Sequence, residues 1–330
     1  LVGLPVMIVI TTRPTLDAHW RPCATKMVLG PLNEQDAHAL LSHTDEAASL
    51  DEQQLQGLVQ SAAGVPLFLQ WLVRSRSSVS HTHIGIHAMV QEQLDVLGPG
   101  RVVLQAAAVL GERFDVETLR AMLPKHAVQA ILARGKQLHL VKPLQGSHWV
   151  FGHGLVQEVI YHGVAKEQRL AWHASAASYL QSCEAAAAEQ VARHWQAAEQ
   201  WAQAAHWWRH AGDASIERDY AGDARSCYAN ALEALTHVRD SYDSTLLRAS
   251  LQLQVGHCLQ MTEGFGSPAA WSLFGQVEQD LRHVSLPASA LDDLRFAALA
   301  GQYMGSSSQG EVAGLGLARQ LSVMAQSPAQ

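Results

Sequence analysis

The pattern of apolar and polar positions predicts a short β-type start and a long helical remainder for this 330-residue chain. Residues 6–10 (VMIVI) form a continuous, mostly β-branched run, which is typical of a buried parallel strand. The run ends at TTRP, residues 11–14, because proline cannot continue a strand ladder. A second short strand is predicted at residues 26–29. Three helices should follow, from the N-cap Asn33 to Leu41, from about 51 to 63 and from 67 to 73.

Residues 84–180 are predicted to be mostly helical with one small hairpin. Helices are expected between Gly98 and Gly111, over about 116–123 and over about 126–138. Two short strands flank QGS at residues 145–147, which is typical of a tight turn. The sequence LVQEVI at residues 155–160 then places one apolar face on a following helix. Helices, a hairpin and another helix are the order of a winged-helix module.

From about residue 181 the chain is rich in alanine and has helical patterns without strand signals. Small and large residues recur at matching offsets in Ala204-Trp208-Ala211, Ala224-Tyr228-Ala231 and Ala270-Phe274-Val277. Gly256 and Gly301 hold similar places in two later helices. This spacing predicts stacked helical hairpins in which a small residue on one helix admits a large one from its neighbour. The period is looser than the roughly 34 residues of a regular tetratricopeptide array, so irregular repeats are expected.

Composition and charge narrow the possible classes. Hydrophobic residues make up 48% and charged residues 16%, which is typical of a globular chain rather than a disordered one. The net charge of −7 argues against a nucleic-acid coat or a polybasic membrane binder. Residues 98–180 carry +4, whereas residues 1–97 carry −4 and residues 181–330 carry −7. No run of eighteen apolar residues and no CxxC occur, so a reduced, cytoplasmic location away from membranes is expected.

Three motifs carry a resemblance to a known family. They are TTRP at residues 11–14, GVPLFL at 64–69 and FGHGLVQEVIY at 151–161. In this order they resemble the STAND class of signal-transduction ATPases, in particular the predicted-ATPase module of bacterial adenylate/guanylate cyclases, kinases and LuxR-type regulators. The resemblance covers nearly the whole chain.

The resemblance implies a mostly α fold in three parts. These are the C-terminal part of an AAA-type α/β ATPase domain with lid helices at residues 1–80, a winged helix at 81–180, and irregular tetratricopeptide-like helical repeats at 181–330.

The same resemblance gives four residues a nucleotide-binding role. Arg13 would contact the terminal phosphates, where a guanidinium forms strong charge-assisted hydrogen bonds. Gly64 and Pro66 would pack against the adenine as a stiff turn. His153 would contact the β-phosphate of ADP and hold a closed state, beside Gly152 where the family usually has arginine. From the residues alone, Arg13 fits an exposed strand end equally well and Gly64-Val65-Pro66 also fits an ordinary turn between helices. For His153 alone, a surface or core histidine without a ligand is favoured.

Two parts of a working ATPase are absent from the sequence. No GxxxxGK[ST] loop occurs, since Gly135-Lys136 is followed by Gln137 within a predicted helix, and no apolar strand ends in paired acids for magnesium. The chain begins at Leu1 and ends in SPAQ, and we expect it to be a fragment of a larger protein. ATP or ADP with magnesium would be cofactors of that protein, whereas the fragment should neither bind them tightly nor hydrolyse ATP.

Other clusters allow a functional and a structural interpretation. His206 and His210 are spaced i,i+4, and three more histidines gather at positions 81, 83 and 87. Without cysteine or carboxylate ligands at familiar spacing, a solvated histidine-rich surface is favoured over a metal site. Four tryptophans lie at positions 195, 201, 207 and 208, where inter-helix packing is favoured over a ligand cage. No Ser-His-Asp or Cys-His arrangement is evident.

Two functions of different classes remain. In the first, by resemblance, the chain belongs to an ATP/ADP-switched regulator whose repeats sense a protein or small-molecule inducer. Those repeats would control an output domain of the same parent chain, such as a cyclase, a kinase or a LuxR-type domain. The alternative is a nucleotide-independent scaffold of helical repeats that binds a protein. Nucleic-acid binding by the +4 segment is the least favoured reading, because the family packs its winged helix on the nucleotide domain.

Overall fold

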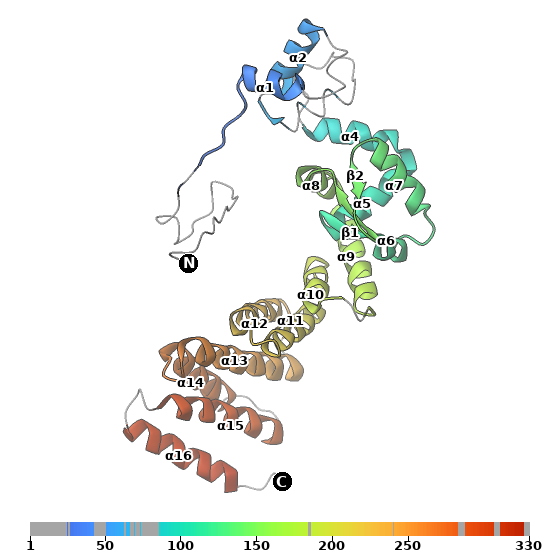
Figure 1. Ribbon diagram of the computed structural model, residues 1–330. Helices are drawn as coiled ribbons and strands as arrows, with labels where there is room; N and C mark the ends of the chain where they lie inside the picture. The colour runs from blue at the N-terminus through green and yellow to red at the C-terminus, as the bar shows by residue number, and fades with distance from the viewer. Residues whose placement is uncertain are drawn as a thin grey trace. The chain divides into compact units, whose positions relative to one another are not determined.

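The computed structural model describes residues 25, 27–42, 51–62, 64–66, 69, 73, 86–183, 186–239, 241–282, 288–306 and 311–326 (Figure 1). Two compact units, Leu1–Met89 and Val90–Gln330, are each described by themselves. Arg13, the strand predicted at residues 6–10 and the histidines at 81 and 83 lie outside the described residues.

The first unit is built on two short helices, α1 (Glu34–Ser42) and α2 (Glu52–Ala62). Asn33 caps α1 as predicted, because its Oδ1 accepts a hydrogen bond from the backbone N–H of Asp36 at 2.8 Å. Asp51 and Gln54 exchange side-chain and backbone hydrogen bonds at the start of α2, which fixes its first turn. The buried core of the unit consists of Ala37, Leu41, Leu58, Val59, Ala62, Leu69 and Val73.

The strand predicted at residues 26–29 is wrong at the positions that the structure describes. Residues 27–30 have no regular structure, and Met27, Val28 and Leu29 are 82%, 74% and 87% exposed. A strand needs a hydrogen-bonded neighbour, and no described residue forms a ladder with this segment. A short apolar run without such a partner does not make a strand.

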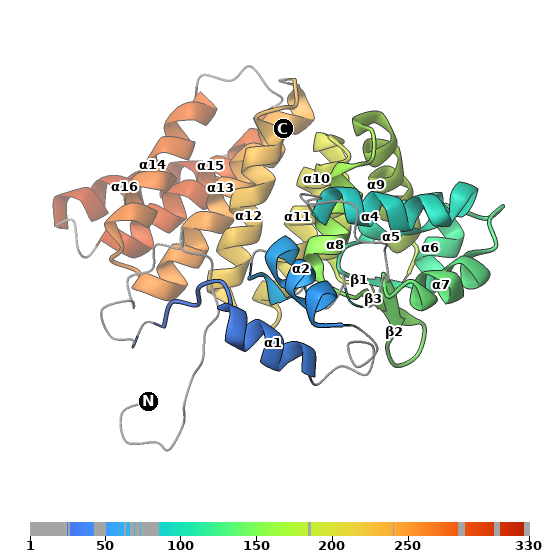
Figure 2. The ribbon, with the colours of Figure 1, turned by 90° about the horizontal axis from the view of Figure 1, so that it is seen from above.

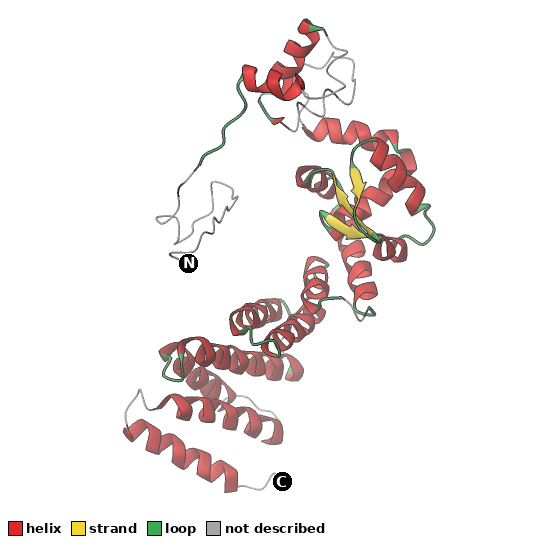
Figure 3. Ribbon diagram, viewed as in Figure 1, coloured by secondary structure: helices red, strands yellow, loops and turns green. Residues whose placement is uncertain are grey.

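The next part combines helices with a small antiparallel sheet, the yellow arrows of Figure 3. In chain order the elements are α4 (Ile86–Val96), the 3₁₀ helix η3 (Gly98–Gly100), α5 (Arg101–Leu110), β1 (Arg113–Asp115), α6 (Val116–Met122), α7 (Val128–Gln137), β2 (Val141–Pro143), β3 (His148–Phe151) and α8 (Gly154–His162). The strand order is β1-β3-β2, with Phe114 opposite Trp149 and Val141 opposite Phe151. The predicted helices and hairpin are confirmed, whereas β1 was not predicted because three residues give no pattern.

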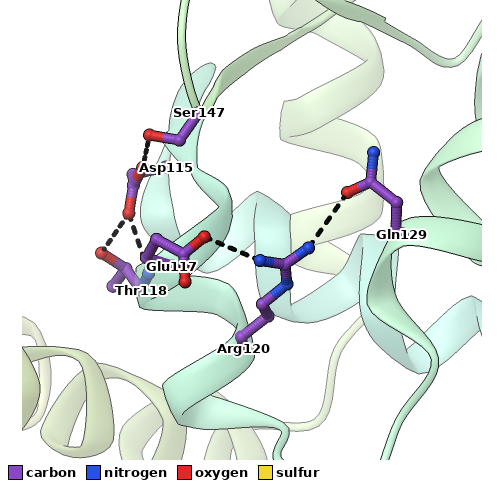
Figure 4. A network of polar contacts seen from close by, with 6 residues as sticks. All are labelled: Asp115, Glu117, Thr118, Arg120, Gln129 and Ser147. Atoms are coloured by element: carbon purple, nitrogen blue, oxygen red, sulfur yellow. Dashed lines mark hydrogen bonds and ion pairs between the residues drawn. The ribbon is translucent and has the colours of Figure 1, made fainter.

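A network of side chains ties the hairpin to the helices (Figure 4). Asp115 caps α6 by accepting hydrogen bonds from the backbone N–H of Thr118 at 2.9 Å and from its hydroxyl at 3.1 Å. The hydroxyl of Ser147, directly before β3, donates to the same carboxylate. Arg120 on α6 reaches Glu117 at 2.7 Å and Gln129 on α7 at 3.4 Å. The network therefore fixes where β3 begins, and with it the backbone that leads to His153.

The remainder is a series of helices that pack in sequence order. These are α9 (Lys166–Leu180), α10 (Ala188–Ala197), α11 (Trp201–Ile216), α12 (Ala221–Leu235), α13 (Tyr242–Glu263), α14 (Pro268–Arg282), α15 (Ala288–Gly305) and α16 (Glu311–Gln326). Each contacts the next, and Figure 2 shows α13 to α16 side by side. Beyond residue 180 the described residues contain no strand and consecutive helices pack against one another, so the helical stack predicted from about residue 181 is confirmed. None of the described helices has the length and apolar character needed to span a membrane.

The predicted fit of small against large residues explains this packing. A Cβ built at Gly256 on α13 would lie 2.5 Å from the Phe274 ring, and one at Gly301 on α15 would lie 2.7 Å from it. The ring of Phe274 on α14 is fully buried between these two glycines. Gly212 on α11 makes the same room for Tyr228 on α12, with a Cβ position 2.4 Å from its ring. Glycine is needed because any Cβ would enter the space of an aromatic ring.

The tryptophans contribute to the same core. Trp208 is 3% exposed, and its indole N–H donates to Oε1 of Gln196 on α10 at 2.6 Å. Trp195 is buried, whereas Trp201 and Trp207 pack against this core while partly exposed. Inter-helix packing is thus confirmed for the cluster.

Candidate functional site

His153 lies at the junction between β3 and α8, where it is exposed and acts as the N-cap of the helix. Its Nδ1 accepts a hydrogen bond from the backbone N–H of Leu155 at 3.1 Å. An accepting Nδ1 carries no proton, so the proton of the neutral ring is on Nε2. The cap therefore fixes the tautomer and leaves an Nε2–H that can donate to an anion beside the positive end of α8.

The backbone that leads to His153 passes close to another segment. The N–H of Gly152 donates to the carbonyl of Leu140 at 2.8 Å, and a Cβ built at Gly152 would lie 2.6 Å from the carbonyl oxygen of His139. His139 itself has a positive φ of 56°, which holds this turn in an unusual conformation. A side chain at position 152 requires a shift of backbone, so this chain has no room for the arginine that the family usually has there.

An acidic residue lies beside the same helix start. A Cβ built at Gly154, the first residue of α8, would be 3.3 Å and 3.8 Å from the two carboxylate oxygens of Glu112. The Glu112 carbonyl also accepts the backbone N–H of Phe151 at 2.9 Å, which keeps the residue at this position. A carboxylate next to a helix N-terminus is stabilised by the helix dipole and repels a second anion, so Glu112 opposes the phosphate contact expected of His153 unless its side chain turns away. No sequence motif drew attention to Glu112.

Gly64 and Pro66 form one turn of the first unit. Gly64 has a φ of 72°, and a Cβ there would lie 2.5 Å from the carbonyl oxygen of Leu32. Its carbonyl accepts the N–H of Leu32 at 2.8 Å, and Pro66, which begins the next helical turn, is exposed. The glycine is therefore required by the close approach of the backbone, and the proline presents a rigid apolar surface.

The four candidate residues do not form one described site. Gly64 and Pro66 share a turn in the first unit, and His153 lies in the second unit. Arg13 lies outside the described residues. A common nucleotide contact for these residues stays a prediction.

The sequence did not reveal a chain of three polar rings, two of which are buried histidines. Tyr161 on α8 bonds to Nε2 of His173 on α9 at 3.1 Å, and Nδ1 of His173 bonds to Nδ1 of His194 on α10 at 2.9 Å. Burial, together with the charges of His194 and Arg169, lowers the pKa of His173 to about 4. Burial also lowers the pKa of His194 to about 4. The signal available in the sequence was a histidine on the apolar face of a helix, beside Trp172, Ala176 and Ala177.

Among the described residues, no group of three or more histidine, cysteine, aspartate or glutamate side chains is arranged to hold a metal ion. The residue at position 87, the one described member of the predicted 81–87 histidine cluster, is exposed at the start of α4.

Comparisons with known proteins give little further constraint. No family model matches the chain. An uncharacterized protein of Rhizobium meliloti (strain 1021) is 26% identical over 196 residues, which cover 52% of this chain. The matched region is 19% of that relative's length, so this chain spans only about a fifth of it.

One solved structure is similar over most of the chain. It is a signal transduction ATPase with numerous domains (STAND) protein with a tetratricopeptide repeat sensor from Pyrococcus horikoshii. The match covers 89% of this chain and 47% of that one, with 12% identity and a TM-score of 0.40. A similarity of this strength carries no argument about function.

Proposed function

We propose that this chain is part of a signal-transduction regulator that switches between ADP-bound and ATP-bound states. The support is the order of three motifs in the sequence, at residues 11–14, 64–69 and 151–161, followed by a stack of helical hairpins. In this proposal the helices from α10 onward, within residues 181–330, sense a protein or small-molecule inducer. They control an output domain of the same parent chain, such as a cyclase, a kinase or a LuxR-type domain.

The proposal treats residues 81–180 as a winged helix. The support is the element order α5-β1-α6-α7-β2-β3 together with the strand order β1-β3-β2, in which the hairpin lies beside a short first strand. The network around Asp115 and Ser147 fixes this hairpin, and β3 leads directly to His153. The module would thus present one defined imidazole to a nucleotide phosphate.

The observation that carries the proposal is the hydrogen bond from the Leu155 N–H to Nδ1 of His153. Because Nδ1 accepts the Leu155 N–H, the neutral ring can donate a hydrogen bond only through its Nε2–H. A phosphate oxygen is an acceptor, so this N–H would be the group that contacts it. Arg13 would contact the terminal phosphates, while Gly64 and Pro66 would support the adenine. Magnesium would bind with the nucleotide in the longer protein, since the sequence of this chain supplies neither a phosphate loop nor paired acids.

The test measures ADP and ATP binding in the longest natural protein that contains these residues. His153→Ala should weaken ADP about ten- to a hundredfold, since a hydrogen bond to a charged partner contributes about 1.5–3 kcal/mol, and should weaken ATP less. The same change should raise basal output activity, because a ligand shifts a two-state equilibrium only by its differential affinity. Equal loss for both nucleotides, or no loss, would contradict the switch.

A second function is favoured by the helical hairpins themselves. The helices from α9 onward carry two buried clusters of their own, one around Trp208 and one around Phe274. Of the described candidates, Gly64, Pro66 and His153 belong to neither cluster, so a nucleotide-independent protein-binding scaffold is the alternative. Binding of an inducer protein that is indifferent to ADP and ATP would favour this function.

A further inference from the structure

Two exposed histidines on α11 face each other across one helical turn. His206 and His210 are spaced i,i+4, so their side chains lie on the same face of the helix. Their Nε2 atoms are 3.1 Å apart and their ring centroids 4.5 Å apart. The Trp207 ring lies beside the pair, 6.3 Å from His206 and 5.6 Å from His210 between centroids. The sequence alone favoured a solvated surface here.

The distance between the two nitrogens matches a bidentate metal ligand. An ion bound at about 2.0–2.1 Å from each nitrogen would subtend an angle of roughly 100° at this 3.1 Å separation. That angle lies between the values for square-planar and tetrahedral coordination. In the free protein one Nε2–H donates to the other Nε2, so binding requires that ring to move its proton to Nδ1.

We propose that His206 and His210 form a binding site for a divalent first-row transition-metal ion. The two Nε2 atoms supply two ligands and water completes the coordination, since the described residues offer no third protein ligand here. By the usual order of stability for nitrogen ligands, Cu²⁺ should bind more tightly than Zn²⁺ or Ni²⁺. The inference is independent of the proposed nucleotide switch.

The test titrates the full 330-residue chain with Cu²⁺ at pH 7 and follows the electron paramagnetic resonance signal of copper bound by two nitrogens. The protein has eighteen histidines, so the result is the difference between the parent and its variants. The parent should bind one equivalent of Cu²⁺ tightly at this site, and we call this the tight equivalent. His206→Asn and His210→Asn should each remove it, because the affinity for Cu²⁺ falls about a hundredfold when the second imidazole is no longer held beside the first. Cu²⁺ should also raise the thermal midpoint of the parent and not of the variants.

Matched controls keep the outcome clear. His126→Asn removes an exposed histidine outside the pair and should leave the tight equivalent unchanged. Mg²⁺, which prefers oxygen ligands, should give no shift of the thermal midpoint. His206→Asn and His210→Asn both lie on an exposed face of α11, and circular dichroism checks that the helical content is unchanged in both variants. If either His206→Asn or His210→Asn retains the tight equivalent, the proposed site is wrong.

Discussion

Two buried histidines should make the stability of the second unit sensitive to acid. His173 and His194 are each 6% exposed, and Tyr161 and the Arg169 charge lie next to His173. Their pKa values, lowered to about 4 from 6.5, mean that both rings are neutral in the folded chain where an unfolded chain binds protons. The free energy of unfolding therefore keeps its full value, as far as these two rings are concerned, above about pH 6.5. It decreases as the pH falls towards 4, because the unfolded chain then binds protons that the folded chain does not.

Chemical denaturation between pH 7 and pH 4.5 measures this effect. We expect the free energy of unfolding to fall with pH by an amount on the order of a few kcal/mol for the pair. The double variant His173→Gln/His194→Gln should be less stable at pH 7 but should have a flatter pH dependence. An equally steep pH dependence in that variant would assign the effect to other groups.

Gly152 is a second residue whose identity has a local physical cause. Because its Cβ would lie 2.6 Å from the carbonyl oxygen of His139, Gly152→Ala should destabilise the protein by about 1–3 kcal/mol, the usual cost of overpacking. Urea denaturation measures the loss. Gly222→Ala, at an open position on α12, is the matched control and should be neutral or slightly stabilising. If Gly152→Ala and Gly222→Ala change the free energy of unfolding by similar amounts, the backbone at His139 moves to accommodate the added methyl group and the predicted overpacking is wrong.

At the scale of the element, Trp208 is the clearest anchor between helices. Trp208→Ala should destabilise by about 3–5 kcal/mol, because it removes a buried indole of α11 and leaves Oε1 of Gln196 without its donor. Trp207→Ala, on the partly exposed side of the same helix, should cost clearly less. Thermal or urea unfolding of both variants makes the comparison. A Trp208→Ala loss below about 0.5 kcal/mol would mean that the residue is not a packing anchor.

Helices were the elements that the sequence predicted best. Asn33 and Gly111 marked caps that depend on residues near in sequence, and the small–large offsets around Tyr228 and Phe274 marked the faces on which neighbouring helices pack. Strands depended on partners. Residues 27–29 had apolar side chains but no described partner, whereas β1 had too few residues for a pattern but pairs with β3. A ladder is decided by distant segments, which a local pattern does not contain.

The candidate site was predicted to a smaller extent, for the same reason. His153 was selected by resemblance, but its tautomer follows from the N–H of Leu155, and the crowding at Gly152 follows from His139. Glu112 approaches Gly154 from another element. The pair His173–His194 meets across two helices. Each of these facts is a contact between segments, so only the three-dimensional structure contains it.

At the scale of the whole molecule, the presence of separate hydrophobic cores predicts that a destabilising substitution in one core lowers the stability mainly of that part of the chain. The first unit has its own core around Leu41 and Leu69, and the helices around Phe274 have another. Gly256→Ala should cost about 1–3 kcal/mol, because the Phe274 ring cannot retreat when Gly301 closes its other side. In stacked helical hairpins such a loss acts mainly on nearest neighbours.

Native-state hydrogen exchange can separate a local loss from a global one. In Gly256→Ala, amide protection should fall in α13, α14 and α15, which pack against one another, and should remain in α5 to α8 and in α1 and α2. The double variant Gly256→Ala/Phe274→Leu should recover part of the protection, because the smaller side chain leaves room for the added methyl group. A uniform fall across the second unit would mean that it unfolds as one cooperative body, in which case a change at α13 would also reach His153 at the start of α8.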